Sequence, residues 1–342
     1  MDLAVGRLDQ LHSLVPRGSR SVHRVALRAS SVRRHWTIKW SLLLLALFCM
    51  PACLRVENFF FAGRPSDGYD FDAVDPKVDG DFSSPHISII PLSLREEGFV
   101  ELPGARVHWV FARHAEGPRT TVLFHHGNGP HLGRFWDRVE VLWQLGYDVM
   151  LFDYPGFGRS TGEASEANTE ASSDAMLEAL LDRDDIDPAQ VVLYGHSLGG
   201  AVALGLAARA ERESTFHTHD GATFAARGVV AESAWCSIEE MILDAAFLDI
   251  PRETLTRLRF DGCAHVRSLR TTPVMLLHGR HDGVVPRRQH TLLAQQAGRA
   301  TTHVNDARHV DVMVVGGEGP DEAGVPGAST DYRDWMEAFA RP

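Results

Sequence analysis

The residue best placed for chemistry is Ser197, in the stretch "VVLYGHSLGG" (191–200). On its own the pattern Gly-x-Ser-x-Gly is weak, because about 0.15 chance matches are expected in a chain with this many glycines. Its context is stronger, since a short apolar strand precedes the serine and a helix rich in Ala and Leu, 198–210, follows it. Such a strand–turn–helix is the setting of a nucleophile elbow, whose tight turn requires Gly195 and Gly199 and whose helix N-terminus favours an oxyanion. The alternative is an inert turn serine.

A serine nucleophile needs a general base, and the base needs an acid that orients it. On this kind of scaffold the expected chain order is Ser, then Asp or Glu, then His. Asp282 lies in "LLHGRHDGVVP" (276–286), just past a predicted strand, and His309 lies in "NDARHVDV" (305–312), just past the last short strand. The order and the positions predict a catalytic triad of Ser197, His309 and Asp282.

Four other side chains compete for these roles. Glu232 follows the predicted strand "GVVAE" and is the second candidate for the acid, although Asp282 has the better-matched motif. His303 is a rival base, but it lies inside the strand-like "TTHVN", which favours a structural role. His196 and His125 flank the motif glycines, where packing or hydrogen bonding is the favoured interpretation.

Two further polar clusters have simpler explanations than chemistry. His217, His219 and Asp220 in "FHTHDG" lack the further ligands of a metal site, so a solvated loop is the better interpretation. Asp153 and Arg159 in "DYPGFGRS" are expected to fix a loop that shapes the site. No metal or organic cofactor is implied.

The elements that position these residues alternate between apolar strands and helices. This order predicts an α/β fold with a mostly parallel sheet covered by helices on both faces. In such sheets ligands bind at the carboxyl ends of the strands, where every candidate falls. The predicted strands are 106–113, 120–127, 148–156, 189–197, 227–234, 271–279 and 300–305, and the predicted helices are 132–145, 165–181, 198–210, 286–298 and 330–340.

A short cap is expected at about 236–272, between two of the predicted strands, with helical periodicity at 237–250. So short a cap suggests a comparatively open acyl site. The apolar residues that either line this site or belong to the core are Phe157, Trp235, Met241 and Phe247.

Four motifs in order resemble the alpha/beta-hydrolase fold, in the branch with "HGN" and "GHSLGG". They are "HGN" (126–128), "DYPGFGRSTG" (153–162), "GHSLGG" (195–200) and "HG-x-x-D-x-x-VP" (278–286), and the resemblance covers about residues 85–342. They are specific for the fold and the triad, and not for the substrate.

The resemblance implies an oxyanion hole made by the backbone N–H groups of Leu198 and Asn128, with Gly127 and Gly129 letting the backbone approach a bound carbonyl. It implies a serine hydrolase of ester-type bonds that forms an acyl-enzyme. The same parts would serve an amidase, peptidase, thioesterase or acyltransferase. From another class, the alternative is a non-catalytic, envelope-associated binding module on the same fold.

Charge divides the chain unevenly. Residues 1–40 hold eight Lys or Arg against two Asp, a net of +6, so the remainder carries −17 because the whole chain carries −11. An acidic body repels phosphate backbones, which argues against nucleic acid as a partner.

The basic stretch runs into "SLLLLALFCM" (41–50), which has the length of a signal-peptide apolar region and half that of a membrane span. Cys53 follows the small residue Ala52, as in a bacterial lipoprotein signal, although Met50 and Pro51 make the match imperfect. Ordinary cleavage near Ala52 and an uncleaved anchor are the alternatives. We therefore expect an exported, membrane-associated envelope protein that acts on small-molecule or lipid esters.

The expected organisation has three parts: an N-terminal extension with a signal at 1–53, a turn-rich linker at 54–98, and the hydrolase domain at 99–342. The four cysteines are Cys49, Cys53, Cys236 and Cys263, which are too few and too scattered to predict a disulfide framework or a zinc site.

Overall fold

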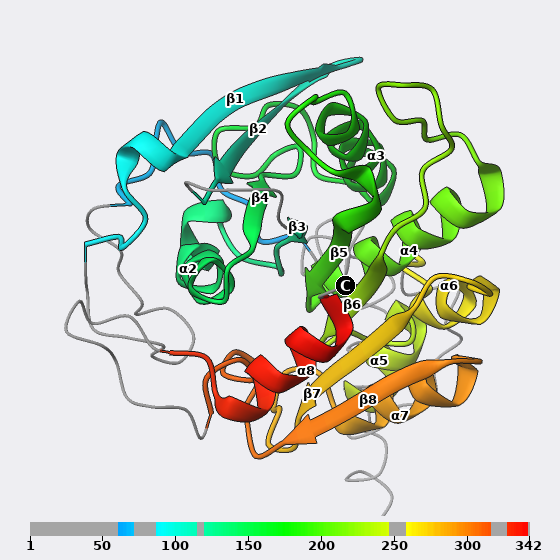
Figure 1. Cartoon of the computed structure of the whole chain (residues 1–342). Helices are drawn as coiled ribbons and strands as arrows, with labels where there is room; N and C mark the ends of the chain where they lie inside the picture. The colour runs from blue at the N-terminus through cyan, green and yellow to red at the C-terminus, as the bar shows by residue number, and fades with distance from the viewer. Residues whose placement is uncertain (1–60, 72–86, 115–119, 246–257, 316–326, 341–342) are drawn as a thin grey trace, which may run out of the picture. The chain divides into compact units, whose positions relative to one another are not determined.

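The computed structural model describes residues 61–71, 87–114, 120–245, 258–315 and 327–340 (Figure 1). These residues form an eight-stranded sheet in the order β1-β2-β4-β3-β5-β6-β7-β8. β1 pairs antiparallel with β2, β2 pairs antiparallel with β4, and all other pairs are parallel. The strands are β1 (Arg95–Leu102), β2 (Ala105–Ala112), β3 (Thr121–His125), β4 (Asp148–Phe152), β5 (Val191–His196), β6 (Gly228–Glu232), β7 (Val274–Gly279) and β8 (Ala300–Asn305).

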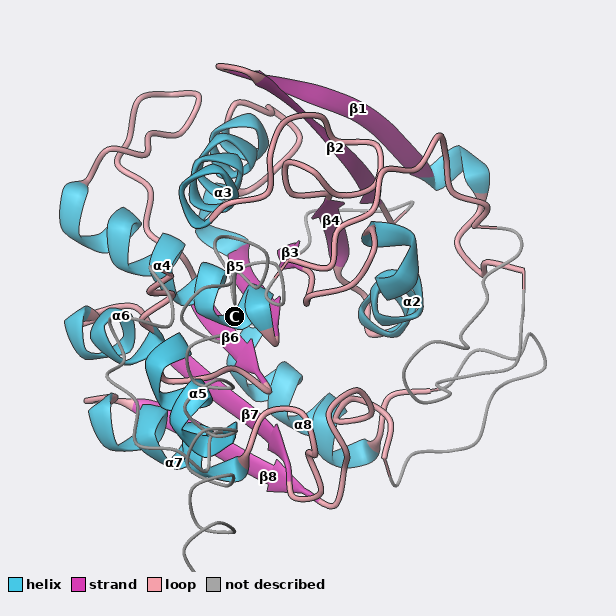
Figure 2. Cartoon of the chain, turned by 180° about the vertical axis from the view of Figure 1, so that it is seen from behind, coloured by secondary structure: helices cyan, strands magenta, loops and turns pink. Residues whose placement is uncertain are grey.

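Helices cover both faces of this sheet (Figures 1 and 2). They are α2 (Trp136–Gln144), α3 (Glu166–Leu181), α4 (Leu198–Glu213), α5 (Ile238–Ala245), α6 (Gly262–Ser268), α7 (Arg287–Gln296) and α8 (Thr330–Ala340). One buried cluster contains side chains of α3, α4, α6 and α7, and a second contains side chains of α2 and α8.

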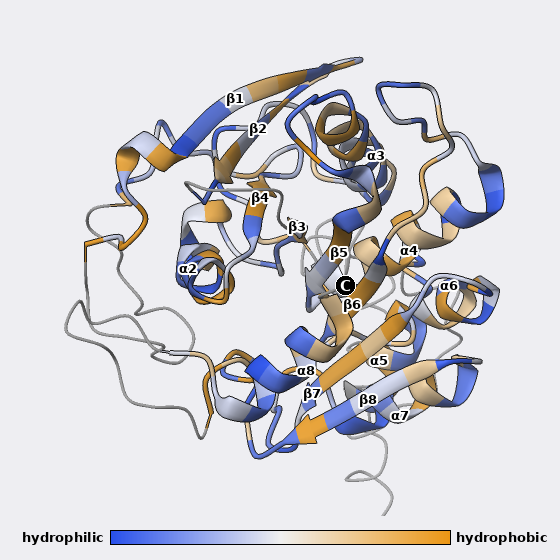
Figure 3. Ribbon diagram, viewed as in Figure 1, coloured by the Kyte–Doolittle hydropathy of each residue, from blue (hydrophilic) through white to orange (hydrophobic). Residues whose placement is uncertain are grey.

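Strand side chains alternate between the two clusters. On β5, Leu193 packs into the first cluster, while Val192 and Tyr194 pack into the second. Successive strand residues point to opposite faces, so a strand covered on both sides is apolar at nearly every position. Figure 3 shows the result, because β6 and β7 are mostly apolar whereas the edge strand β8 is largely polar. The predicted α/β fold is confirmed.

The two ends of the sheet differ from the sequence expectation in detail. β1 was not anticipated, and it begins at Arg95, inside the segment expected as a linker. It forms an antiparallel hairpin with β2 at Leu102–Ala105, where Gly104 has a φ of +79°. A half-exposed antiparallel strand lacks the continuous apolar run that marks the buried parallel strands, which explains why periodicity did not find it.

The cap contains α5 and α6, with residues 246–257 outside the described part, so the expected helix 237–250 is seen as Ile238–Ala245. Among the described helices, none is long and apolar enough to cross a membrane. The expected signal and lipidation site at 1–53, Cys53 included, lie outside the described residues.

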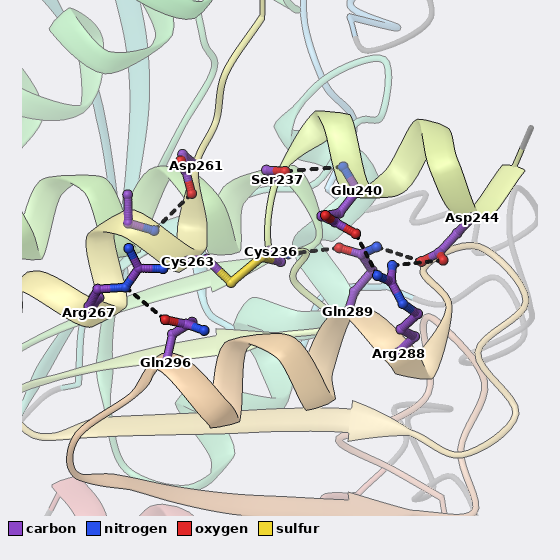
Figure 4. The surroundings of a disulfide bond; sticks show 11 residues. Cys236, Ser237, Glu240, Asp244, Asp261, Cys263, Arg267, Arg288, Gln289 and Gln296 are labelled. Carbon is purple, nitrogen blue, oxygen red and sulfur yellow. Dashed lines mark hydrogen bonds and ion pairs between the residues drawn. A yellow bond between two sulfur atoms is a disulfide. The ribbon is translucent and has the colours of Figure 1, made fainter. Parts of the chain in front are cut away.

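A disulfide joins Cys236, after β6, to Cys263 in the first turn of α6 (Figure 4). The expectation that the cysteines are too scattered missed this pair. The chain returns to the same place after 27 residues, so the two Cα atoms lie 4.6 Å apart, and the N–H of Cys263 donates to the carbonyl of Cys236 at 2.8 Å. The N–H of Cys236 in turn donates to Gln289 Oε1 at 3.0 Å, which ties the start of the cap to α7.

Candidate active site

Ser197 occupies a strained turn between β5 and α4. Its φ of 55° and ψ of −118° lie in a region that L-residues rarely adopt. A Cβ added at Gly195 would meet the carbonyl oxygen of Gly199 at 1.9 Å, and one added at Gly199 would meet the carbonyl oxygen of His125 at 1.9 Å. Only glycine fits at both positions, which is the geometry that a nucleophile elbow requires. The elbow is closed by the Ser197 N–H, which donates to the Glu232 carbonyl at 2.8 Å.

Helix α4 starts directly after the serine, at Leu198. The N–H groups in the first turn of a helix have no acceptor inside that helix, and the helix dipole makes this end electropositive. The buried Leu198 is thus the first helical residue after Ser197, at the electropositive end of α4.

His309 and Asp282 form the predicted pair. His309 Nδ1 lies 2.8 Å from Asp282 Oδ2, and the other oxygen, Oδ1, accepts from the N–H groups of Val284 at 2.9 Å and Val285 at 2.8 Å. Burial acts to raise the pKa of Asp282, but the His309 hydrogen bond and charge and the Val285 N–H outweigh it and lower that pKa below its ordinary value. Asp282 therefore stays ionised and orients the imidazole.

The loop that carries His309 is bonded to the elbow itself. His196, the residue before Ser197, has its Nε2 3.0 Å from the carbonyl oxygen of His309, and the two rings are centred 4.8 Å apart. His196 is buried, and this burial lowers its pKa well below the ordinary value, so it donates as a neutral imidazole. The hydrogen-bonding role expected for His196 is what the structure shows.

Glu232, the second candidate for the catalytic acid, binds Arg138 and not a histidine. Its two carboxylate oxygens each lie 2.8 Å from Arg138 Nη1 of α2, and Tyr194 donates to Oε2 at 2.6 Å. This buried ion pair reaches the His309 loop, because Arg138 Nη2 donates to the carbonyl of Val310 at 2.7 Å. Arg138 was not among the residues expected at the site, because it lies between the charged residues Asp137 and Glu140 in the expected helix 132–145 and gives no distinct signal there.

The loop after β3 lies against the nucleophile. A Cβ at Gly127 would come within 3.3 Å of Ser197 Cβ and 2.8 Å of His196 Nδ1. Asn128 follows Gly127, so its backbone lies at the position that the resemblance assigns to the second oxyanion donor.

Asp153 holds this loop, as expected from the sequence. Its Oδ1 accepts from the Leu132 N–H at 2.7 Å and its Oδ2 accepts from the Arg159 N–H at 3.2 Å, while Tyr69 also donates to Oδ2. Asp153 is fully buried and so serves as an internal anchor for two loops.

The remaining candidates have structural roles. His303 stacks on Trp335 of α8 with ring centres 4.3 Å apart, and the buried His125 contacts the Tyr194 carbonyl and Ser173 Oγ. His217 is exposed, and no group of three metal-ligating side chains occurs within the described ranges.

The apolar residues expected near the acyl site divide in the same way. Phe157 and Trp235 are buried in the core, and Met241 of α5 is half-buried against it. Phe247 lies outside the described residues.

Comparisons with known proteins agree with this architecture. A family model described as alpha/beta hydrolase fold matches residues 120–217. The chain is 28% identical over 231 residues to the uncharacterized protein YfhR of Escherichia coli K12, covering 65% of this chain and 76% of YfhR. An alpha-beta hydrolase from Vibrio vulnificus superposes with a TM-score of 0.54 at 19% identity, over 72% of this chain and 79% of the other.

An esterase from Pyrococcus furiosus is similar with a TM-score of 0.51 at 18% identity, over 80% of this chain and 97% of the esterase. The matched region 120–217 holds both the elbow and the loop of Asn128. With this strand order and these neighbours, the chain has the alpha/beta-hydrolase fold.

Proposed function

We propose that this protein is a serine hydrolase that cleaves ester-type bonds through an acyl-enzyme. The observation that carries the proposal is the pairing of two features at one edge of the sheet. Ser197 is held in a strained turn in which positions 195 and 199 have room only for glycine. His309, which is paired with Asp282, accepts a hydrogen bond through its backbone carbonyl from His196, the residue before Ser197.

In the proposed mechanism, Ser197 Oγ attacks the ester carbonyl while His309 Nε2 takes its proton. Asp282 accepts from Nδ1–H, which fixes the tautomer and stabilises the imidazolium that forms. The N–H groups of Leu198 and Asn128 stabilise the oxyanion. His309 returns the proton to the leaving alcohol. A water molecule, deprotonated by His309, then attacks the acyl-enzyme, and His309 gives the proton to Ser197 Oγ as the acid leaves.

An ester is preferred to an amide or thioester as the bond because two similar solved structures are called esterases, one from Pyrococcus furiosus and an acetyl xylan esterase from Thermoanaerobacterium. This preference concerns bond type alone, since such remote likeness does not carry substrate identity.

The test is covalent labelling with a fluorophosphonate probe, followed by mapping of the labelled peptide. We expect the label on Ser197 and none on a Ser197→Ala variant that melts at the wild-type temperature. Turnover should then be compared on matched p-nitrophenyl esters, anilides and thioesters. An unlabelled, inactive wild type would instead favour a binding module, and faster anilide turnover would favour an amidase.

We further propose export and lipidation at Cys53, on the basis of the basic stretch, the apolar run and the small residue before the cysteine. The Cys236–Cys263 disulfide supports export, because disulfides form and persist in oxidising compartments.

A further inference from the structure

The residues 61–69, called the strap below, lie against both loops that shape the site. The Arg64 N–H donates to the carbonyl of Pro130 at 3.0 Å, and the Arg64 carbonyl accepts from the Gly158 N–H at 2.9 Å. The Ser66 N–H then donates to the Gly158 carbonyl at 2.8 Å. The strap therefore pairs by its backbone with the loop after β3 on one side and the loop after β4 on the other, although it falls in the segment expected as a linker.

The strap also holds the side chain of Asn128. The Ala62 N–H donates to Asn128 Oδ1 at 2.6 Å, so the short side chain of this residue is fixed by a backbone group 66 positions earlier. The strap therefore binds the loop after β3 at two nearby positions, the Asn128 side chain and the Pro130 carbonyl. Fixing its side chain limits rotation of the same residue's backbone, including the N–H proposed as an oxyanion donor.

Packing keeps the strap in this place. The Phe61 ring lies 6.5 Å from the ring of Phe157 and 6.1 Å from that of Phe260. A Cβ at Gly63 would approach the Phe157 ring to 2.6 Å, so only glycine lets the strap backbone lie this close to the ring. At the other end, Tyr69 donates to Asp153, the carboxylate that accepts from the Leu132 N–H. The loop after β3 is thereby held near both of its ends.

We infer that the strap belongs to the catalytic unit, where Ala62 acts as a positioning residue that orients Asn128 for oxyanion stabilisation. This inference rests on the proposed function. Donors aimed at a developing oxyanion act in the transition state and contribute little to substrate binding. Loss of the Ala62–Asn128 bond should therefore lower kcat and leave KM nearly unchanged.

The experiment uses the full-length chain with Ala62→Pro, which removes the N–H, and Ala62→Ser as the matched control, which keeps it. We expect Ala62→Pro to lower kcat by about tenfold to a hundredfold, below the cost of deleting an oxyanion donor outright, with the control near wild type. The acid side of the pH–rate profile should not move, because the His309–Asp282 pair is untouched.

Asn128→Ala tests the same bond from its other side, since it removes the acceptor oxygen and keeps the backbone N–H of residue 128. It should cause a similar fall in kcat. The Ala62→Pro/Asn128→Ala double variant should lose no more kcat than either single variant, because both substitutions remove the same hydrogen bond. Wild-type kcat in Ala62→Pro, or fully additive losses, would overturn the inference while a labelled, active wild type still upheld the proposed function. An unlabelled and inactive wild type would reject both.

Discussion

Two buried carboxylates lie at or just after the carboxyl ends of the neighbouring strands β6 and β7, and they have different partners. Asp282 follows β7 and faces His309, whereas Glu232 ends β6 and faces Arg138 and Tyr194. Neither side chain is exposed to solvent. Glu232 is occupied by a permanent cation whereas Asp282 contacts the imidazole, so these partners favour Asp282 as the acid in the proposed triad.

We predict opposite profiles for the two isosteric variants. Asp282→Asn should lower kcat/KM by about 10³-fold or more with a modest change in stability, because the imidazole loses its orienting acceptor. Glu232→Gln should remove the carboxylate that Arg138 binds in the interior, and breaking such a buried ion pair costs about 3–5 kcal/mol of unfolding free energy. Kinetics and urea midpoints should be measured for each variant. A mild Asp282→Asn together with a severe kinetic loss in Glu232→Gln would reassign the acid.

The buried imidazole of His125 should make the free energy of unfolding depend on pH. Burial lowers its pKa to about 4, whereas an unfolded histidine titrates near 6.5. Between these values the unfolded chain binds the extra proton, so stability is fully present above about pH 6.5 and is lost as pH falls towards 4. The difference corresponds to about 3 kcal/mol.

The measurement is the urea midpoint as a function of pH from 7.5 to 4.5. His125→Gln should be less stable at neutral pH and should show a shallower slope between pH 6.5 and 4.5. The exposed His217→Gln serves as the control and should keep the wild-type slope. An unchanged slope in His125→Gln would show that other groups govern the acid transition.

At the scale of elements, a disulfide joins two parts of the cap, and ion pairs join the cap to α7. The disulfide joins the loop after β6 to α6, and Arg288 of α7 pairs with Glu240 and Asp244 of α5 at 2.7 and 3.0 Å (Figure 4). These links hold α5 beside α7, and the start of the cap beside α6.

We predict that the disulfide stabilises the fold by about 3.5 kcal/mol, because it closes a loop of 27 residues in the unfolded chain. The Cys236→Ala/Cys263→Ala double variant should have a lower melting temperature than oxidised wild type. Reductant should lower the wild-type melting temperature and leave that of the double variant unchanged. Equal melting of reduced and oxidised wild type would remove the stabilising role.

How far the sequence predicted these elements depends on how local their signals are. Strand–turn–helix motifs are local, so Ser197, Asp282 and His309 were predicted at strand ends where the structure places them. The strap, Arg138 and the disulfide depend on contacts between distant segments, such as Ala62 with Asn128 and Arg138 with Glu232. Neither periodicity nor motif spacing reports such contacts, because each partner looks ordinary in its own neighbourhood.

At the scale of the whole molecule, the chain order of anchor and site matters. Phe61, the first residue of the strap, lies eight positions after Cys53. At about 3.3–3.6 Å per residue, that length spans at most about 29 Å. A lipid on Cys53 would therefore hold the strap, and the oxyanion loop bonded to it, within that distance of a membrane surface. The acidic charge of residues 41–342 would oppose close binding to anionic lipid headgroups, so the lipid itself must supply the attachment.

We predict that wild-type protein expressed at full length enters the membrane fraction and incorporates a radiolabelled or clickable fatty acid. Several acyl chains on one cysteine anchor a protein stably, whereas a single chain gives only marginal binding. Cys53→Ala should lose the acyl label and either become soluble or remain unprocessed at higher mass. Cys49→Ala is the matched control, because it removes a thiol four residues earlier within the same segment and should behave as wild type. A Cys53→Ala protein that keeps its label, mobility and membrane partition would show that the protein is held by some other means.

Vesicles that present lipophilic esters then complete the test, since the anchored enzyme should turn these over faster than Cys53→Ala does, while both cleave a soluble p-nitrophenyl ester at the same rate.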